Sequence, residues 1–231
     1  YVYTRNTSTG VGGREQKILA SDKQASDYFG YSVSISGDYA IVGAFLEDAG
    51  GTDAGAAYIY TRNGTTWGSE QKILSSDIGA GDRFGCSVSI SGDYAIVGAQ
   101  AEDVGGSDAG AAYIYTRNGT TWGNEKKILS SDAEADDEFG WSVSISGDYA
   151  IVGARTEDTG GSNAGAAYIL ERSGTTWTEV KKIVASDAQA SDTFGISVAI
   201  DGTRAISGSG AGAVYIFDKS TLAELKFDNY N

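Results

Sequence analysis

The chain has 231 residues, of which 41% are apolar, and it contains no His, Pro or Met. Its 17 basic and 31 acidic residues give a formal net charge of −14. This charge argues against nucleic acid, because neutralising phosphates requires clustered Lys and Arg. The apolar runs are broken by Gly, Ser and Asp and fall short of the roughly 18 residues that suggest a membrane span. We therefore expect a folded domain with cationic or basic partners, no nucleic acid and no membrane insertion.

One sequence recurs every 55 residues along the chain. The string FGYSVSISGDYAIVGA begins at Phe29, and near-identical copies begin at Phe84 and Phe139. A weaker copy, FGISVAIDGTRAISGS, begins at Phe194. A second block, AGAAYIYTRNGTTW or a variant of it, follows each copy. Self-similarity at a fixed period indicates a repeat architecture.

Each unit is predicted to form four short strands. Ser32–Ser36 alternates apolar and polar residues, as a half-buried strand does, and 39–44 is apolar on both faces. Residues 57–61 are rich in aromatic and β-branched side chains, and 70–74 forms a more polar outer strand. Gly37-Asp38 and Asn63-Gly64 are turn and hairpin signals between them.

Four-stranded units repeated at this interval are typical of β-propeller blades. The predicted fold is all-β, a β-propeller of four-stranded antiparallel blades with a 55-residue repeat. A β-solenoid is the alternative and fits less well, because it uses parallel strands and needs no Asn-Gly hairpins. The predicted units, all in one propeller domain, are a half blade at 1–19, blades at 29–74, 84–129 and 139–184, a blade with a shortened loop at 194–227, and a tail at 228–231.

This organisation gives about 18 strands, which does not divide into blades of four. A half blade is therefore left over at the N-terminal end, and we expect the chain to form part of a larger or incomplete ring. An unclosed ring exposes a hydrophobic blade face, so self-association through that unclosed blade edge is a further expectation.

The Phe-Gly that opens each unit, the Val-Gly-Ala that closes its second strand and the following Gly-Ala-Ala-Tyr-Ile-Tyr resemble FG-GAP repeats, the repeats of integrin α chains. The amino-acid sequence of the repeats is more similar to the bacterial branch of this family than to the animal branch. The resemblance implies an extracellular, secreted or cell-surface propeller with a role in adhesion or protein interaction. Some blades of the family carry an Asp-x-Asp-x-Asp-Gly calcium loop, and this sequence has no such string.

Acidic residues concentrate in the loops that follow the second and fourth strands of each unit, which hold 19 of the 31 acidic residues. Calcium takes six to eight oxygen ligands, and Gly lets backbone carbonyls turn toward an ion. A solvated Gly-rich turn in which Asp caps the backbone is the alternative interpretation. The candidate calcium ligands in these loops are Glu47, Asp48, Asp53, Glu102, Asp103, Asp108, Glu157 and Asp158.

The differences between copies fall mainly in the same loops. Variable loops on a repeated scaffold are where recognition usually lies, although drift in exposed loops would give the same pattern. The candidate residues for a ligand or partner face are Tyr28, Phe45, Arg83, Gln100, Glu138 and Arg155.

Catalysis is not expected from this sequence. Without His there is no Ser-His-Asp or Cys-His unit, and Cys86 is predicted to be a packed apolar side chain. Near-identical carboxylates on every unit differ from the unique pair that a glycosidase needs. Two alternatives to adhesion stay open: a carbohydrate-binding propeller that uses Trp67, Trp122 and Trp177, and a structural repeat that assembles with other chains.

Overall fold

The computed structural model describes residues 2–5, 12–218 and 223–224, all of which belong to strands, turns or irregular segments. The last residues of the fifth predicted unit and the tail 228–231 lie outside the described residues. Strands β1 (Val2–Arg5) and β2 (Gly12–Gln16) pair as a two-stranded sheet, the half blade. The other sixteen strands form four antiparallel sheets of four, in which the strands pair in chain order.

These four sheets are named blades 1 to 4. Blade 1 comprises β3 (Ser32–Ser36), β4 (Tyr39–Ala44), β5 (Ala56–Asn63) and β6 (Thr66–Ile73). Blade 2 comprises β7 (Phe84–Ser91), β8 (Tyr94–Ala99), β9 (Ala111–Asn118) and β10 (Thr121–Ile128). Blade 3 comprises β11 (Phe139–Ser146), β12 (Tyr149–Ala154), β13 (Ala166–Ser173) and β14 (Thr176–Ile183). Blade 4 comprises β15 (Ser197–Asp201), β16 (Arg204–Gly208), β17 (Val214–Asp218) and β18 (Ala223–Glu224).

Tight turns set the register inside each blade. Ser36 pairs with Tyr39 and Asn63 pairs with Thr66, so both hairpins have two-residue loops. Each loop begins with a glycine of positive φ, 58° at Gly37 and 62° at Gly64, as a twisted hairpin prefers. The strands of the second hairpin extend farther than the sequence suggests, because this short loop lets them pair up to the turn.

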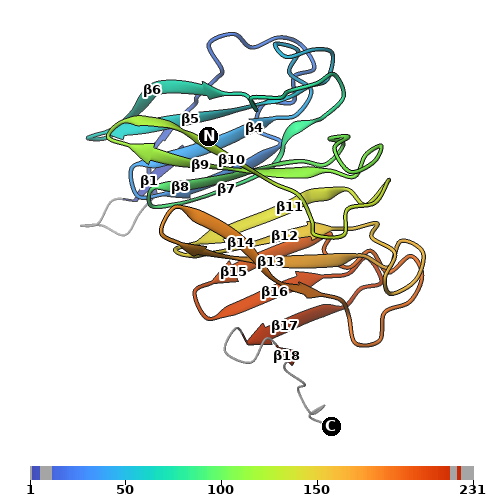
Figure 1. Cartoon of the computed structure of the whole chain (residues 1–231). Helices are drawn as coiled ribbons and strands as arrows, with labels where there is room; N and C mark the ends of the chain where they lie inside the picture. The colour runs from blue at the N-terminus through green and yellow to red at the C-terminus, as the bar shows by residue number, and fades with distance from the viewer. Residues whose placement is uncertain (1, 6–11, 219–222, 225–231) are drawn as a thin grey trace.

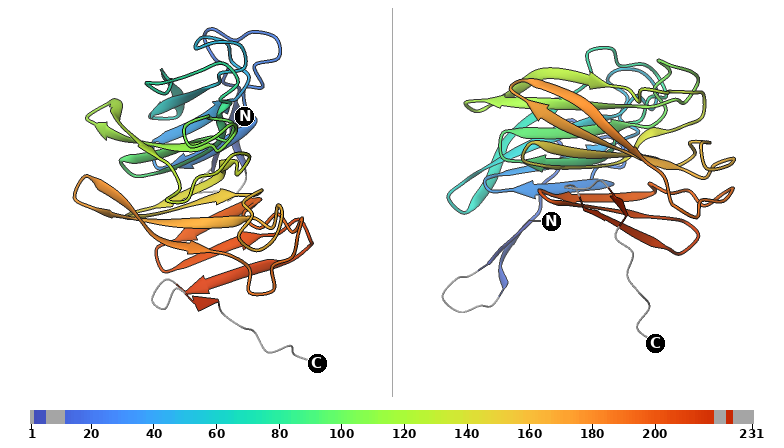
Figure 2. Two further views of the ribbon diagram at one scale, coloured as in Figure 1. Left: turned by 45° about the vertical axis from the view of Figure 1, so that its right-hand side comes forward. Right: turned by 60° about the horizontal axis from the view of Figure 1, so that its bottom comes forward.

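The blades follow one another in a fanned stack (Figures 1 and 2). The first strands of adjacent blades, β3, β7, β11 and β15, contact one another. The fan therefore converges on these innermost strands, which define its hub, and the fourth strands lie on the outside. All neighbours within a blade are antiparallel, which excludes the β-solenoid.

Side chains from facing blades make the core. Ile41 and Ile59 of blade 1 meet Phe84, Val97 and Tyr113 of blade 2 in one buried cluster. The same kind of cluster recurs between blades 2 and 3 and between blades 3 and 4. A blade therefore completes its core only when a neighbour stacks on it.

The propeller prediction is confirmed as to class, with four packed blades, a half blade and a ring that is not closed. Within the part of the chain that the structure describes, no helix is long and apolar enough to cross a bilayer.

Candidate functional site

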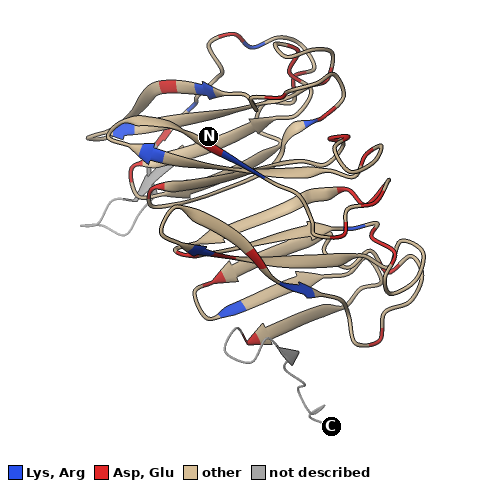
Figure 3. Cartoon of the chain, in the orientation of Figure 1, with Lys and Arg blue, Asp and Glu red and all other residues tan. Residues whose placement is uncertain are grey.

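The loops after the second and fourth strands gather at one end of the stack, where most of the acidic residues lie (Figure 3). This loop end carries every residue that the sequence nominates for metal or partner binding. The opposite end carries the short hairpin turns. The contacts of each nominated residue decide which of them are available for binding.

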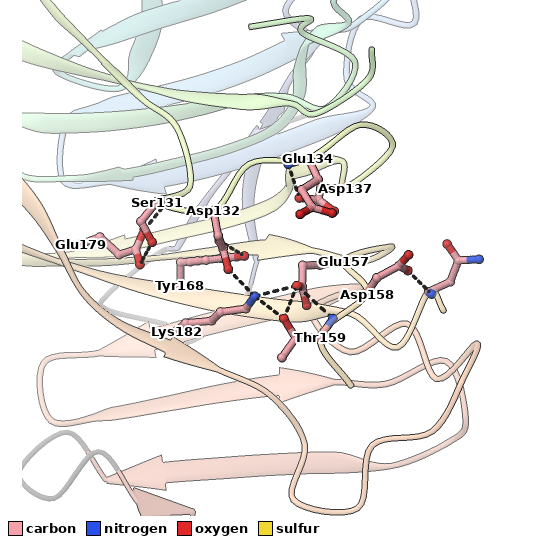
Figure 4. Close-up of polar contacts among 11 residues, drawn as sticks. Ser131, Asp132, Glu134, Asp137, Glu157, Asp158, Thr159, Tyr168, Glu179 and Lys182 are labelled. Atoms are coloured by element: carbon pink, nitrogen blue, oxygen red, sulfur yellow. Dashed lines mark hydrogen bonds and ion pairs between the residues drawn. The ribbon is translucent and has the colours of Figure 1, made fainter. Parts of the chain in front are cut away.

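A lysine clamp ties the loops of each of blades 1 to 3 together. In blade 3, Lys182 Nζ lies 2.5 Å from Asp132 Oδ2 and 2.6 Å from Glu157 Oε1 (Figure 4). The Tyr168 hydroxyl donates to the other oxygen of Asp132 at 2.9 Å. The clamp joins the segment that enters the blade, the loop after its second strand and its outermost strand. The equivalent groups are Lys72, Asp22, Glu47 and Tyr58 in blade 1 and Lys127, Asp77, Glu102 and Tyr113 in blade 2.

Two carboxylates in the loop after the second strand, Glu47 of the clamp and its neighbour Asp48, also cap backbone amides. Asp48 Oδ1 accepts a hydrogen bond from the Asp53 amide at 2.9 Å, and Glu47 Oε2 accepts one from the Ala49 amide at 3.1 Å. Asp53 itself has a φ of 55°, a left-handed conformation that Asp tolerates better than most residues. The loops of blades 2 and 3 repeat these bonds through Glu102, Asp103, Glu157 and Asp158.

Six of the eight predicted calcium ligands, Glu47, Asp48, Glu102, Asp103, Glu157 and Asp158, are therefore engaged with lysine or with backbone amides. Among the described residues no three acidic, His or Cys side chains converge as a metal site would require. The geometry supports the alternative interpretation of these loops, in which Asp and Glu cap Gly-rich turns.

A second aspartate precedes each Phe-Gly pair and caps the turn before it. In blade 3, Asp137 Oδ2 accepts from the Glu134 amide at 2.8 Å (Figure 4). Asp137 is only 4% exposed. Its burial, together with the nearby charges of Glu157 and Asp132, raises the pKa of its carboxyl to about 6.

Replacing Asp137 with asparagine is expected to stabilise the protein at pH 8 and to change little at pH 4. The raised pKa means that the folded state binds this proton more tightly than the unfolded state does. The protonated Asp137 carboxyl therefore contributes to the stability of the folded state at low pH, and this contribution is lost as pH rises through about 6. Asparagine removes the buried charge, for an expected gain of roughly 1 to 2 kcal/mol at pH 8. Urea unfolding of the variant and of the unchanged protein at several pH values from 4 to 8 measures this difference in the free energy of unfolding.

Asp192→Asn is the matched control, because Asp192 caps the Gln189 amide in the same way but is less buried. If Asp137→Asn lowers stability equally at pH 4 and pH 8, the carboxylate acts only as a cap.

Three of the nominated partner residues, together with Thr193 at the equivalent position of blade 4, have an unusual backbone geometry. Tyr28, Arg83, Glu138 and Thr193 occupy one equivalent position and have φ of 55°, 58°, 54° and 49°. The left-handed region is unfavourable for side chains other than Gly, Asn and Asp, and most unfavourable for β-branched ones such as Thr. In each blade the carbonyl of this residue accepts a hydrogen bond from the backbone amide three positions later. In blade 1 the Tyr31 amide donates to the Tyr28 carbonyl at 3.0 Å. This turn presents the variable side chain at the start of the innermost strand.

Three variable positions recur in each blade and are joined by side-chain contacts in blades 1 and 3; we call these three positions the variable cluster. In blade 1 the Phe45 ring lies 5.3 Å from Tyr28 and 4.4 Å from Tyr31, between centroids. In blade 3 Arg155 pairs with Glu138 and lies over the ring of Trp141, with 3.2 Å from Cζ to the centroid. The clusters are Tyr28, Tyr31 and Phe45 in blade 1; Arg83, Cys86 and Gln100 in blade 2; Glu138, Trp141 and Arg155 in blade 3; and Thr193, Ile196 and Gly210 in blade 4.

The cluster of blade 2 differs from the prediction in one respect. Gln100, nominated for the partner face, is only 7% exposed, and the Cys86 thiol, itself buried, donates to the Gly140 carbonyl of blade 3 at 3.5 Å. Burial raises the pKa of Cys86 to about 11, in part opposed by hydrogen bonds, so the thiol stays protonated and unreactive at neutral pH. Glu138 of blade 3 lies near enough for its charge to act on Cys86, so neighbouring clusters adjoin around the hub. Arg83 is the exposed member.

The recurrent tryptophans are buried. Trp67, Trp122 and Trp177 are 4 to 5% exposed and belong to the cores of the blades. A side chain that stacks on a sugar must be accessible, so the carbohydrate-binding alternative loses the residues on which it was based.

Tyr31 and Trp141 belong to the clusters but are not among the residues that the sequence nominates for a partner face. The signal that would have added them is in the repeat itself, since the residue after each Phe-Gly is Tyr, Cys, Trp or Ile within an otherwise constant string. What the sequence does not give is the contact between this position and the two others.

Comparison with solved structures shows the same type of fold. The computationally designed Ika4 protein aligns with 89% of this chain and 99% of its own, with a TM-score of 0.51 and 10% identity. A structure from a study of two prolyl endopeptidases aligns with 85% of this chain and 27% of its own, with a TM-score of 0.50 and 14% identity. No curated protein matches the sequence significantly.

The model of the FG-GAP repeat family matches residues 13–60, 67–115, 122–170 and 177–217, which is most of the chain. Each matched repeat begins in the last strand of one sheet, β2 of the half blade or the fourth strand of a blade, and ends in the third strand of the next, so consecutive repeats interlock adjacent sheets. With this match and the packed four-stranded sheets, the chain belongs to the FG-GAP repeat family.

Proposed function

We propose that this chain is a non-catalytic protein-interaction module of an extracellular or cell-surface protein, which binds its partner through the variable cluster. One observation carries the proposal: the left-handed position at the start of each innermost strand holds Tyr, Arg, Glu or Thr and never Gly. Glycine would relieve the backbone there by roughly 1 to 2 kcal/mol. A side chain kept at a strained position supports a role in recognition.

The chemistry of the clusters supports the same proposal. Tyr28 and Tyr31 are 57% and 56% exposed, and aromatic residues are enriched in protein interfaces. Arg83 and the Glu138–Arg155 pair add charges of both signs beside them. Calcium has no part in the proposal, because lysine and backbone amides already engage six of the eight nominated loop carboxylates.

Adhesion is tested with fibronectin, fibrinogen and collagen immobilised on a sensor surface. The chain is expected to bind at least one of them, and Tyr28→Ala with Phe45→Ala is expected to weaken that binding at least tenfold. Thr65→Ala with Thr120→Ala is the matched control at the opposite end, where both side chains are exposed. Binding that the cluster variants and the control variants affect equally contradicts the proposal, and adhesion fails if none of the three proteins binds.

Arg83→Gly separates recognition from folding. Because Arg83 is exposed and its φ is 58°, glycine is expected to raise the free energy of unfolding by about 1 kcal/mol. The same change is expected to weaken partner binding, since it removes the accessible cation of the cluster. Thermal unfolding and the binding assay measure the two effects on one sample. If Arg83→Gly lowers the free energy of unfolding and leaves partner binding unchanged, both expectations are wrong.

A further inference from the structure

The face of blade 1 that points away from blade 2 is open along its inner half. Val33 and Ile35 are 68% and 58% exposed there, whereas the equivalent Val88 and Ile90 of blade 2 are 7% and 4% exposed. A cavity of about 730 Å³ lies between the half blade and strands β3 and β4. We call this cavity and the exposed face beside it the blade 1 groove.

The interface between blades 1 and 2 shows what covers such a face. The inner hairpin of blade 1, strands β3 and β4, lies over the innermost strand of blade 2. Three serines on alternate positions of β3 then bond to the free edge of β7. The bonds run from Ser32 Oγ to the Gly85 carbonyl at 2.8 Å, from the Ile90 amide to Ser34 Oγ at 3.2 Å, and from the Gly92 amide to Ser36 Oγ at 3.2 Å.

The next two interfaces repeat this serine ladder. Between blades 2 and 3 it uses Ser87, Ser89 and Ser91, and between blades 3 and 4 it uses Ser142, Ser144 and Ser146. Exposed strand edges otherwise invite uncontrolled pairing, so the ladder closes each innermost edge with hydroxyl groups. Its spacing, serine at every second residue, matches the period of a strand.

In blade 1 the corresponding backbone groups belong to Gly30, Ile35 and Gly37. Within the described chain no serine hydroxyl reaches the amides of Ile35 and Gly37. A Cβ built on Gly30 meets no described atom within 4 Å, whereas one built on Gly85 overlaps the Ala56 carbonyl of the preceding blade. The blade 1 groove therefore has both the apolar surface and the backbone groups of a blade interface, without the hairpin that covers them elsewhere.

The outer half of the same face is already occupied. The Gln16 amide group of the half blade donates to the Trp67 carbonyl at 2.6 Å and accepts from the Trp67 amide at 2.8 Å. Gln71 and Trp122 make the same pair of bonds between blades 1 and 2. The half blade therefore occupies the positions of the third and fourth strands of a blade stacked on blade 1. The groove beside it corresponds to the positions of the first and second strands of that blade.

We propose that the blade 1 groove docks a β-hairpin donated by another FG-GAP repeat chain, with serine at three alternate positions of its first strand and glycine in its second. The first serine donates to the Gly30 carbonyl, and the other two accept from the Ile35 and Gly37 amides. The glycine is required because the equivalent Gly43 lies against the Gly85 carbonyl with no room for a Cβ. The docking surface begins at Gly30, between Tyr28 and Tyr31 of the variable cluster, and continues along β3 away from it.

A second copy of this chain stacked through blade 4 does not supply this chemistry. In β15, Ala199 and Asp201 replace the second and third serines of the ladder. Stacked on the groove, this strand would leave the Ile35 amide without an acceptor, which is costly for a buried donor.

A fluorescent peptide with the sequence of residues 29–44, FGYSVSISGDYAIVGA, tests the proposal on the full chain. Saturable binding by fluorescence anisotropy and a rise in the melting temperature with peptide concentration are expected, because a ligand of the folded state stabilises it. The serine-free peptide FGYAVAIAGDYAIVGA has equal length and similar apolar surface. It is expected to bind at least tenfold more weakly.

Ile35→Asp is expected to lower the affinity for the peptide at least tenfold without unfolding the chain, since Ile35 is exposed. Val214→Asp, at the exposed face of blade 4, is the control and should leave the affinity unchanged. Equal binding of the serine-free peptide, or no binding of either peptide, overturns the proposal. So does a dimer in light scattering that Ile35→Asp dissolves, because a second copy would then cover the groove.

Discussion

Gly98→Ala is expected to destabilise the protein by about 3 kcal/mol or more, the size of effect seen when a packed interface is overfilled. Gly98 lies in β8 of blade 2, and a Cβ there would overlap the carbonyl oxygen of Gly140 in blade 3 and the hydroxyl of Ser87. The obstacle is backbone of the next blade, which cannot rotate away as a side chain can. Urea unfolding followed by tryptophan fluorescence measures the loss.

Gly208→Ala is the matched control for this prediction. Gly208 holds the same position in blade 4, where the nearest described atoms to a Cβ are 3.8 Å away and no further blade is stacked among the described residues. Alanine there is expected to be neutral or slightly stabilising, because it restricts the unfolded chain. Equal losses of stability at Gly98 and Gly208 would show that the destabilisation arises within a single blade and not from the packing of neighbouring blades.

Lys127→Met is expected to lower the free energy of unfolding by about 2 to 4 kcal/mol at pH 7. Lys127 lies 2.6 Å from Asp77 and 2.7 Å from Glu102, and the Glu102 side chain is only 6% exposed. Methionine keeps most of the apolar stem but leaves a buried carboxylate without its counter-charge, which is the costly way to break such a pair. Urea unfolding of the variant measures the effect.

The pH dependence of this clamp follows from its pKa shifts. Burial opposes the charged form of Lys127, but hydrogen bonds to Asp77 and Glu102 outweigh it and raise the pKa of the ammonium. Burial likewise opposes the charge on Asp77, but Lys127 and Tyr113 outweigh it and lower the pKa of that carboxyl. The contribution of Asp77 is therefore present above pH 3.8 and is lost in acid, and that of Lys127 is present below pH 10.5 and is lost in alkali.

Lys126→Met is the control for the clamp, because Lys126 is the exposed neighbour on the other face of the same strand. It is expected to change stability by less than about 0.5 kcal/mol. If Lys126→Met and Lys127→Met cost the same at pH 7, or if the effect of Lys127→Met persists unchanged at pH 3, the clamp does not stabilise the fold as described.

Much of the architecture was accessible from the sequence because its signals are local. The alternation of Ser32–Ser36 and the two-residue turns at Gly37 and Gly64 depend on residues next to one another. The half blade at the N-terminal end followed from the number of strands.

The candidate site was less accessible, since its contacts join residues far apart in sequence. Lys127 and Asp77 are 50 residues apart and meet only because the chain between them folds into a blade. The many acidic residues at the loop end suggested solvent-exposed carboxylates or metal ligands. The structure pairs several of them with lysine and with backbone amides, because a buried carboxylate needs such partners.

The sequence by itself determined the four-stranded unit, its 55-residue period and the end of each unit at which variation collects. These properties follow from side-chain periodicity and turn chemistry, which act within a few residues. Only the tertiary structure decided that Tyr28, Tyr31 and Phe45 touch, that the tryptophans are buried and that the inner face of blade 1 is open. The physical reason is that burial is a property of stacked blades, and a single blade in isolation buries neither of its faces.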